Sequence, residues 1–398
     1  MRSRLFSIVL AALAVAALVT AQAVSAHGKQ RGGGSAVFVQ TNELGGNQVV
    51  VFERGSDGLL TRDGAYATGG NGGAAAPGTE SDRLATQGSL VYDDGHRLLF
   101  AVNAGSDSVS VFKVQGTRLS LTDVISSGGD FPAGVAVHDD LVYVLNAGGT
   151  GIVQGFEIRG HHLRPLDGSA RSLGLANTDP PNFLTSPGQV GFTPNGRRLI
   201  VTTKASRSTI DVYRVRRDGR LSRDAVRNAS ATPVPFAFTF DPFDRLVSGE
   251  AGASSVTTYT LRRDRTLANP QSQTDGQMAL CWIVRAGDFY YVSNTGSNNV
   301  SGYRIDAGGN PTLIGPTGIV ATTEPGPIGM TVAGGGRFLY VQTGTTGTVD
   351  EFRVNGDGSP DEAGRRHRPT SRPGRHRPEL TTSSSEGLAS RLPSDGRL

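Results

Sequence analysis

Seven tight turns recur along the 398-residue chain, and two of them carry charged residues that could take part in chemistry. The equivalent position of each turn is occupied in order by Asn42, Asn103, Asn146, Lys204, Glu250, Asn294 and Thr343. Lys204 and Glu250 thus place opposite charges in consecutive repeats where neutral turn formers otherwise stand. A partly buried charge loses hydration and usually needs a partner. A lysine ammonium in such a turn can neutralise a carboxylate or a developing oxyanion.

The same residues also have a purely structural explanation. Asparagine favours tight turns because its side chain hydrogen-bonds nearby backbone groups. Asn103, Asn146 and Asn294 are therefore either turn formers or contacts to a bound substrate. Lys204 and Glu250 could equally form a solvated ion pair at the rim of the fold, where such a pair contributes little to stability.

Pairs of short strands must position these turns. The segment LLFAVNAGSDSVSVFKV (98–114) has two runs of alternating apolar residues around a turn, which predicts a β-hairpin. Six similar segments begin at Val37, Leu141, Leu199, Leu246, Phe289 and Phe338. The second strand of each copy carries an aromatic anchor, and successive anchors are 44 to 60 residues apart: Phe52, Phe112, Phe156, Tyr213, Tyr259, Tyr303 and Phe352. Such a repeat without helical periodicity predicts an all-β, seven-bladed β-propeller of four-stranded antiparallel blades.

The innermost strand of one blade is missing from this pattern. Six segments predict inner strands, and they begin at Gln87, Pro132, Ser186, Pro235, Met278 and Pro325. Ring closure places the seventh after Val354, because an unpaired strand edge exposes backbone donors and acceptors. The sequence that follows is rich in Pro and Arg and has no apolar alternation, which is typical of disorder. One hypothesis is that this tail replaces a lost closing strand, for instance through a frameshift. The alternative is a native tail on a ring closed in another way.

The N-terminal segment has the features of a secretory signal peptide. Arg2 and Arg4 precede an apolar run over 5–19, and small residues at 24–26 form a cleavage site. We therefore expect a secreted protein that is cleaved after Ala26 and is not associated with a membrane thereafter. The predicted domains are a signal peptide (1–26), a disordered leader (27–35), the seven-bladed propeller (36–358) and a disordered basic tail (359–398).

Composition argues against several classes of function. The formal net charge is +4 at pH 7, but the signal peptide and the basic tail account for the excess, so the predicted propeller is close to neutral and does not resemble a nucleic-acid binder. Cys281 is the single cysteine, which excludes an internal disulfide and suggests a small core residue. No spacing resembles a metal site, a phosphate loop or a dinucleotide fingerprint. We therefore expect no metal and no cofactor, and a monomeric protein.

The segment TPNGRRLIVTTKASRSTIDVYRVRRDGRLS (193–222) and the recurrent Val-x-Asn-x-Gly hairpins resemble the lactonase family of seven-bladed propellers. That family includes bacterial 6-phosphogluconolactonase and fungal carboxymuconate cyclase. The resemblance covers about 36–355, and its strongest residues are those that build blades. It implies a site at the mouth of the central channel that handles lactones or their carboxylate products. By the same resemblance Glu250 aligns with a family glutamate and would act as general base or proton donor beside Lys204.

The chain departs from that family at two places. Ser186–Gln189 stands where the family has a histidine-rich segment, and Pro235–Ala237 stands where it has a Pro-Arg-His stretch. Gln189 and Arg285 remain as candidate substrate contacts. The enzyme hypothesis is a lactonase-like hydrolase or cycloisomerase that acts on a small lactone or carboxylate, and export argues against 6-phosphogluconate as the substrate. The alternative hypothesis is a non-catalytic extracellular propeller that binds a small molecule, a glycan or another protein.

Overall fold

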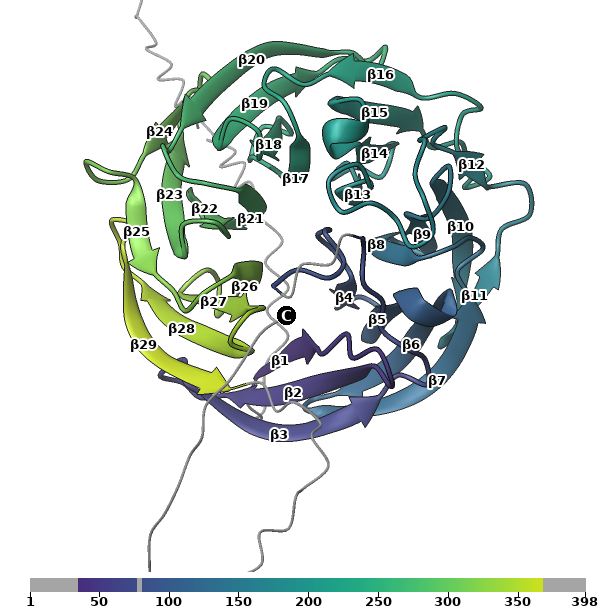
Figure 1. Cartoon of the computed structure of the whole chain (residues 1–398), viewed down its shortest axis with the longest axis horizontal. Coiled ribbons are helices and arrows are strands. Elements are labelled where there is room, and N and C mark those ends of the chain that lie inside the picture. The colour runs from purple at the N-terminus through teal and green to yellow at the C-terminus, as the bar shows by residue number, and fades with distance from the viewer. Residues whose placement is uncertain (1–34, 77–80, 368–398) are drawn as a thin grey trace, which may run out of the picture.

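Seven antiparallel sheets surround a central channel in the computed structural model, which describes residues 35–76 and 81–367 (Figure 1). The predicted seven-bladed β-propeller is confirmed. Short 3-10 helices, η1 (Ala104–Ser106) and η2 (Lys204–Ser206), lie in two of the hairpin turns. Within the described ranges, no helix has the length and apolarity needed to cross a membrane. The predicted signal peptide lies outside these ranges.

The first four blades follow one another around the ring. Blade 1 contains β1 (Ser35–Gln40), β2 (Gln48–Arg54) and β3 (Leu60–Ala67). Blade 2 contains β4 (Leu90–Asp93), β5 (Leu98–Asn103), β6 (Ser108–Gln115) and β7 (Arg118–Ser126). Blade 3 contains β8 (Pro132–His138), β9 (Leu141–Asn146), β10 (Ile152–Arg159), β11 (His162–Pro165) and β12 (Arg171–Ser172). Blade 4 contains β13 (Gln189–Phe192), β14 (Arg198–Thr202), β15 (Thr209–Arg214) and β16 (Val226–Ala229).

The remaining three blades complete the circle. Blade 5 contains β17 (Pro235–Phe240), β18 (Leu246–Glu250), β19 (Ser255–Leu261) and β20 (Leu267–Thr274). Blade 6 contains β21 (Leu280–Ala286), β22 (Phe289–Asn294), β23 (Asn299–Ile305), β24 (Pro311–Leu313) and β25 (Ile319–Thr322). Blade 7 contains β26 (Pro327–Ala333), β27 (Phe338–Thr343), β28 (Thr348–Val354) and β29 (Pro360–His367).

The aromatic anchors hold the blades together as their spacing predicts. All seven are buried, with exposed fractions of 3% or less. Phe112 illustrates their packing: it joins Leu99 of its own blade and Val49 and Val51 of blade 1 in one hydrophobic cluster. A buried aromatic side chain of this kind contributes about 3–5 kcal/mol to stability relative to alanine. The core of the propeller therefore lies between blades, and each blade depends on its neighbours.

The seven hairpins and six innermost strands that the sequence predicts are all found in the part of the chain that the structure describes. Blade 1 contains a hairpin and an outer strand, and β1 pairs with β2 alone within the described residues. The other six blades each have an innermost strand, namely β4, β8, β13, β17, β21 and β26. The position beside β1, on the channel side of blade 1, is therefore not filled by the part of the chain that the structure describes (Figure 1).

The predicted start of the tail at residue 359 is wrong, because β29 continues the propeller to His367. This strand pairs with β28 from Val354↔Pro360 to Thr348↔His367 and forms the outer edge of blade 7. Its sequence, PDEAGRRH, lacks apolar alternation, and the strand is held by backbone pairing along its whole length. Arg365 adds a hydrogen bond from Nε to Oδ1 of the buried Asp350 at 2.8 Å. The expected disorder of the later tail falls outside the described residues.

Candidate functional site

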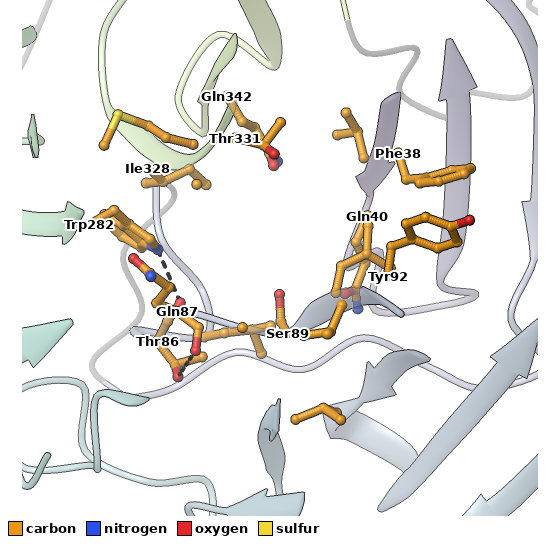
Figure 2. A pocket seen from close by; sticks show the side chains of 18 of the residues that line it. Phe38, Gln40, Thr86, Gln87, Ser89, Tyr92, Trp282, Ile328, Thr331 and Gln342 are labelled. Atoms are coloured by element: carbon orange, nitrogen blue, oxygen red, sulfur yellow. Dashed lines mark hydrogen bonds between the residues drawn. The ribbon is translucent and has the colours of Figure 1, made fainter. Parts of the chain in front are cut away.

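The central channel contains a cavity of about 1220 Å³. Its wall is formed largely by the innermost strands of blades 2, 3, 4 and 7, together with β1 and Trp282 of β21. Figure 2 shows side chains from blade 1 and blade 7 facing each other across the open space, with Thr86, Gln87 and Ser89 below them. The wall combines aliphatic and aromatic side chains with polar ones and includes the charged residues Glu43, Asp82 and Arg83, a composition suited to a small polar molecule.

A segment that we call the central strap (residues 81–89) crosses the middle of the ring. The Gln87 backbone N–H and the Thr86 hydroxyl both donate to the Gly188 carbonyl of blade 4, at 2.9 and 2.7 Å. Trp282 of blade 6 donates from Nε1 to the Thr86 carbonyl at 3.2 Å (Figure 2). The Val135 N–H of blade 3 donates to the carbonyl of Gly88. The strap thus ties three blades together and brings its own side chains to the cavity.

Asp82 of the strap is the acidic group with the most perturbed environment at the cavity wall. Its side chain lines the cavity yet is 5% exposed, and Oδ1 accepts a hydrogen bond from the Ala85 N–H at 2.8 Å. Burial raises the pKa of Asp82 to about 6, although the Ala85 N–H and the positive charge of Lys204 oppose the rise. A carboxylate whose pKa approaches neutrality in a cavity is a candidate general base.

Lys204 lies behind this wall, not at the channel mouth. Its ammonium donates to the carbonyl oxygens of Ala85 and Phe183 at 2.7 and 2.6 Å, and to Ser186 Oγ at 2.9 Å. Nζ also lies 5.3 and 5.0 Å from the ring centroids of Phe183 and Phe236. Burial lowers the pKa of Lys204 to about 7, partly opposed by the negative charge of Asp82.

These contacts explain the lysine in the turn series. The link between β3 and β4 (68–89) and the link between β12 and β13 (173–188) are the two long insertions of the ring. They meet at a bridge between Ala76 and Asn182, and the ammonium of Lys204 bonds to both. Lys204 is therefore a positioning residue that fixes the strap from behind.

Glu250 is likewise buried, with no exposed surface, and it organises its own blade. Oε2 accepts hydrogen bonds from the N–H and hydroxyl of Thr232 and from the hydroxyl of Thr257. Oε1 accepts from the hydroxyl of Tyr259. Burial raises the pKa of Glu250, and the bonds from Thr232, Tyr259 and Thr257 oppose this rise. The interpretation as a solvated rim pair with Lys204 is wrong, since both side chains are buried and no ion pair joins them within the described residues.

The three asparagines predicted as alternative substrate contacts are buried structural groups. Asn103 donates to Ser108 Oγ and Ser110 Oγ, and Asn294 makes matching bonds to its own hairpin. Asn146 donates to the Ser127 carbonyl at 3.1 Å. None of the three is among the residues that line the cavity. Their geometry favours the turn-forming explanation.

Gln189 is the one predicted site residue that reaches the cavity wall. Its amide pairs with the backbone of Phe238 on β17, accepting from N at 2.6 Å and donating to O at 3.2 Å. Gln87 of the strap pairs with Ile283 in the same way. Arg285 instead lies at a separate shallow depression and donates from Nε to the Gly287 carbonyl.

Sequence reasoning missed Asp82 and Trp282, although a signal for each was present. The anchors Phe52 and Phe112 are 60 residues apart, the longest step of the series, which marks an insertion within this repeat. Long insertions in compact domains are often functional. Trp282 is the single tryptophan of the chain. No rule of spacing, however, places an inserted segment across the channel.

Cys281 and His96, two further titratable groups that the structure describes, lie in different blades and are not among the residues that line the cavity. Cys281 is buried as predicted, and burial raises the pKa of its thiol to about 12, which makes it a poor nucleophile. His96 contacts Asp93 and Asp140 on the surface between blades 2 and 3. Within the described ranges, no group of three or more His, Cys, Asp or Glu residues could hold a metal ion.

Comparison with solved structures identifies the fold. A proposed 6-phosphogluconolactonase from Bacteroides uniformis superposes with a TM-score of 0.64 at 16% identity, over 79% of this chain and 90% of that one. The periplasmic gluconolactonase of Pseudomonas aeruginosa gives 0.63 at 17% identity, over 84% of this chain and 95% of that one. This chain has the fold of lactonase-type propellers. At such low identity the likeness extends to the fold alone.

Comparison of the sequence with known proteins gives less information on relatives than comparison of the structure does. No protein-family model matches the chain. An uncharacterized protein of Staphylococcus saprophyticus is 25% identical over 149 residues. This match covers 28% of the present chain and 43% of that relative's length.

Proposed function

We propose that the protein opens a small lactone in the central cavity by hydrolysis, with Asp82 as the general base. The observation that carries this proposal is the position of Asp82, a largely buried carboxyl at the wall of the cavity. Its raised pKa of about 6 supports the same role, because the group is ionised at neutral pH and still basic enough to accept a proton. The lactonase-type fold supports the substrate class by analogy.

Hydrolysis of a lactone in this cavity would require a general base and a group that stabilises the oxyanion. The Asp82 carboxylate takes a proton from a water molecule as the water oxygen attacks the carbonyl carbon of the lactone. The ring carbon–oxygen bond then breaks, and the leaving oxygen takes the proton back from Asp82. The product is a hydroxy acid, and Asp82 returns to its ionised form. Arg83, the next residue along the wall, is the candidate cation for stabilising the oxyanion.

Lys204 and the strap hold this base in place. The backbone of Ala85 connects the two residues, since its N–H donates to Asp82 and its carbonyl oxygen accepts from Lys204. We also propose that the protein works outside the cytoplasm as a monomer, after removal of residues 1–26. Under that proposal the substrate is an unphosphorylated lactone, because phosphorylated sugar lactones belong to cytoplasmic metabolism.

The test is proton release from a panel of lactones by the chain that begins at His27. Aldonolactones, muconolactones and acyl-homoserine lactones would be compared with Asp82→Asn and with Asp264→Asn, a control at an exposed turn. We expect kcat/KM of the unmodified protein to fall below about pH 6, and Asp82→Asn to lose at least about a hundredfold in kcat. Full turnover in Asp82→Asn would refute the assignment of the base. Saturable binding without turnover would favour the non-catalytic propeller.

A further inference from the structure

Positive charge in this propeller is concentrated in one blade. The segment that forms blade 4 (189–229) contains ten Lys and Arg residues against three Asp and Glu residues. The other described residues contain 19 basic and 28 acidic side chains, so that part of the ring is negative. Because the two parts nearly cancel, the overall charge conceals a strongly positive region within a negative ring.

Six exposed arginines form a surface that we call the arginine face. They come from the turns that follow β13 and β15 of blade 4 and β19 of blade 5. The three strands run in the same direction, so their ends lie on one side of the ring. The members of the arginine face are Arg197, Arg214, Arg216, Arg217, Arg262 and Arg263.

Direct contacts join these turns into one surface. Arg198 pairs with Arg214 in the sheet of blade 4 and follows Arg197 in the chain. Its guanidinium reaches blade 5, where Nη2 donates to the carbonyl oxygen of Arg263 at 3.0 Å. Burial lowers the pKa of Arg198, and the nearby positive charges of Arg214 and Arg265 lower it further. The arginine face is therefore continuous across two neighbouring blades (Figure 1).

The guanidinium groups of the arginine face are available to a ligand. Within the described ranges, none of the six takes part in an ion pair or donates a side-chain hydrogen bond. The acidic residues of the same turns bond elsewhere: Asp218 pairs with Arg220 at 3.2 Å, and Asp264 accepts from the N–H and the hydroxyl of Thr266. Like charges held close together repel one another, so a bound anion would relieve this repulsion.

We propose that the arginine face binds an anionic polysaccharide. The planar guanidinium group bonds carboxylate and similar oxyanions through two parallel hydrogen bonds. The six arginines are not among the residues that line the central cavity or the depression at Arg285, so the face does not enclose a small ligand. A polymer with repeated anionic groups can instead contact several exposed arginines at once, and its weak contacts add up. This inference does not depend on the proposed function.

The surroundings favour a polysaccharide over a nucleic acid. Sites for single-stranded nucleic acids carry aromatic side chains on which bases stack. In blade 4, however, Tyr213 is buried and Phe192 lines the cavity, while the exposed Phe243 of blade 5 lies 5.0 Å from Cζ of Arg245. A DNA duplex carries one charge per about 1.7 Å of its length. The negative remainder of the ring repels so dense a polyanion more strongly than a chain with one carboxylate per sugar unit.

Binding of fluorescently labelled polygalacturonate to the chain from His27, followed by anisotropy, tests the proposal. One variant removes three charges of the arginine face: Arg214→Gln, Arg216→Gln and Arg217→Gln. The matched control removes three exposed charges from the outer strands of blades 1, 2 and 3: Arg62→Gln, Arg118→Gln and Arg164→Gln. At about 50 mM salt we expect the first variant to bind at least about tenfold more weakly and the control to change by less than about twofold. Equal losses in the two variants, or no binding by the unmodified protein, would overturn the proposal.

Two further measurements make the test independent of a single variant. Arg262→Gln combined with Arg263→Gln changes the part of the face on blade 5 and should also weaken binding, because the face spans both blades. Unchanged affinity in this double variant would contradict a continuous surface. A DNA duplex is the second probe, at the same salt concentration. Tighter binding of the duplex than of polygalacturonate, lost in the same variants, would refute the polysaccharide and assign the face to nucleic acid.

Discussion

Removal of the Glu250 carboxylate should destabilise blade 5 without affecting a cavity reaction. The carboxylate accepts hydrogen bonds from Thr232, Thr257 and Tyr259 in a site without exposed surface. In Glu250→Ala the two threonine hydroxyls can turn to Ser255 and Ser272, their other neighbours. The Thr232 N–H and the Tyr259 hydroxyl would lose their acceptor. Two buried orphan donors and the lost packing cost about 3–5 kcal/mol.

Glu250→Gln is the matched variant that keeps the shape. The amide oxygen of the glutamine can still accept hydrogen bonds from Thr232 and Thr257. Its NH₂ group would face the Tyr259 hydroxyl and cannot accept the hydrogen bond that this hydroxyl donates. Because burial raises the pKa of Glu250, replacing the charged form with a neutral amide also relieves some desolvation. The expected cost is about 1–2 kcal/mol.

Thermal unfolding and lactone turnover together decide the role of Glu250. For a domain of this size, about 3–5 kcal/mol corresponds to a fall in Tm of roughly 4–7 °C for Glu250→Ala, with a smaller fall for Glu250→Gln. Turnover per folded molecule should not change in either variant, because Glu250 does not line the cavity. Turnover abolished in Glu250→Gln at an unchanged Tm would refute this reasoning and support the catalytic role that the family resemblance implies.

Two further predictions concern stability. The pKa of lysine is 10.5 in the unfolded chain, and burial lowers the pKa of Lys204 to about 7 in the folded protein. Between these two pH values the unfolded state binds more protons than the folded state, so the free energy of unfolding should rise with pH. Urea titrations between pH 7 and 8.5, below the range where buried Tyr and Cys ionise, should show this rise, and Lys204→Met should flatten it; an equal slope in both proteins would contradict the burial of the ammonium. Arg365→Gln should lower the free energy of unfolding by about 2 kcal/mol, because Asp350 is buried and loses a charged hydrogen bond. Urea unfolding beside the exposed control Arg159→Gln would measure this, and equal stability of the two variants would exclude a structural role for β29.

The blades and their number were predictable from the sequence because the information is local. Alternation at period two and turn residues define each hairpin within about twenty residues, and the aromatic anchor repeats in every copy. The seven hairpins and six innermost strands that this pattern predicts are all present among residues 35–76 and 81–367. The outer strand β29 was not predicted from the sequence. Backbone pairing with β28 holds it in place, and such pairing requires no particular pattern of side chains.

The site depended on contacts between segments far apart in the chain. Lys204 and Glu250 could be recognised as exceptional from the repeat alone, since each breaks a series of neutral turn residues. Their partners could be found only in the folded chain, where Lys204 bonds two inserted links and Glu250 bonds the link before its own blade. The tertiary structure also places Asp82 at the cavity wall, because the strap crosses the ring and bonds three other blades. A charged residue in a series of neutral turn residues indicates that it has a partner. For Lys204 that partner is the backbone of two inserted links, whose path through the fold cannot be predicted from local sequence patterns.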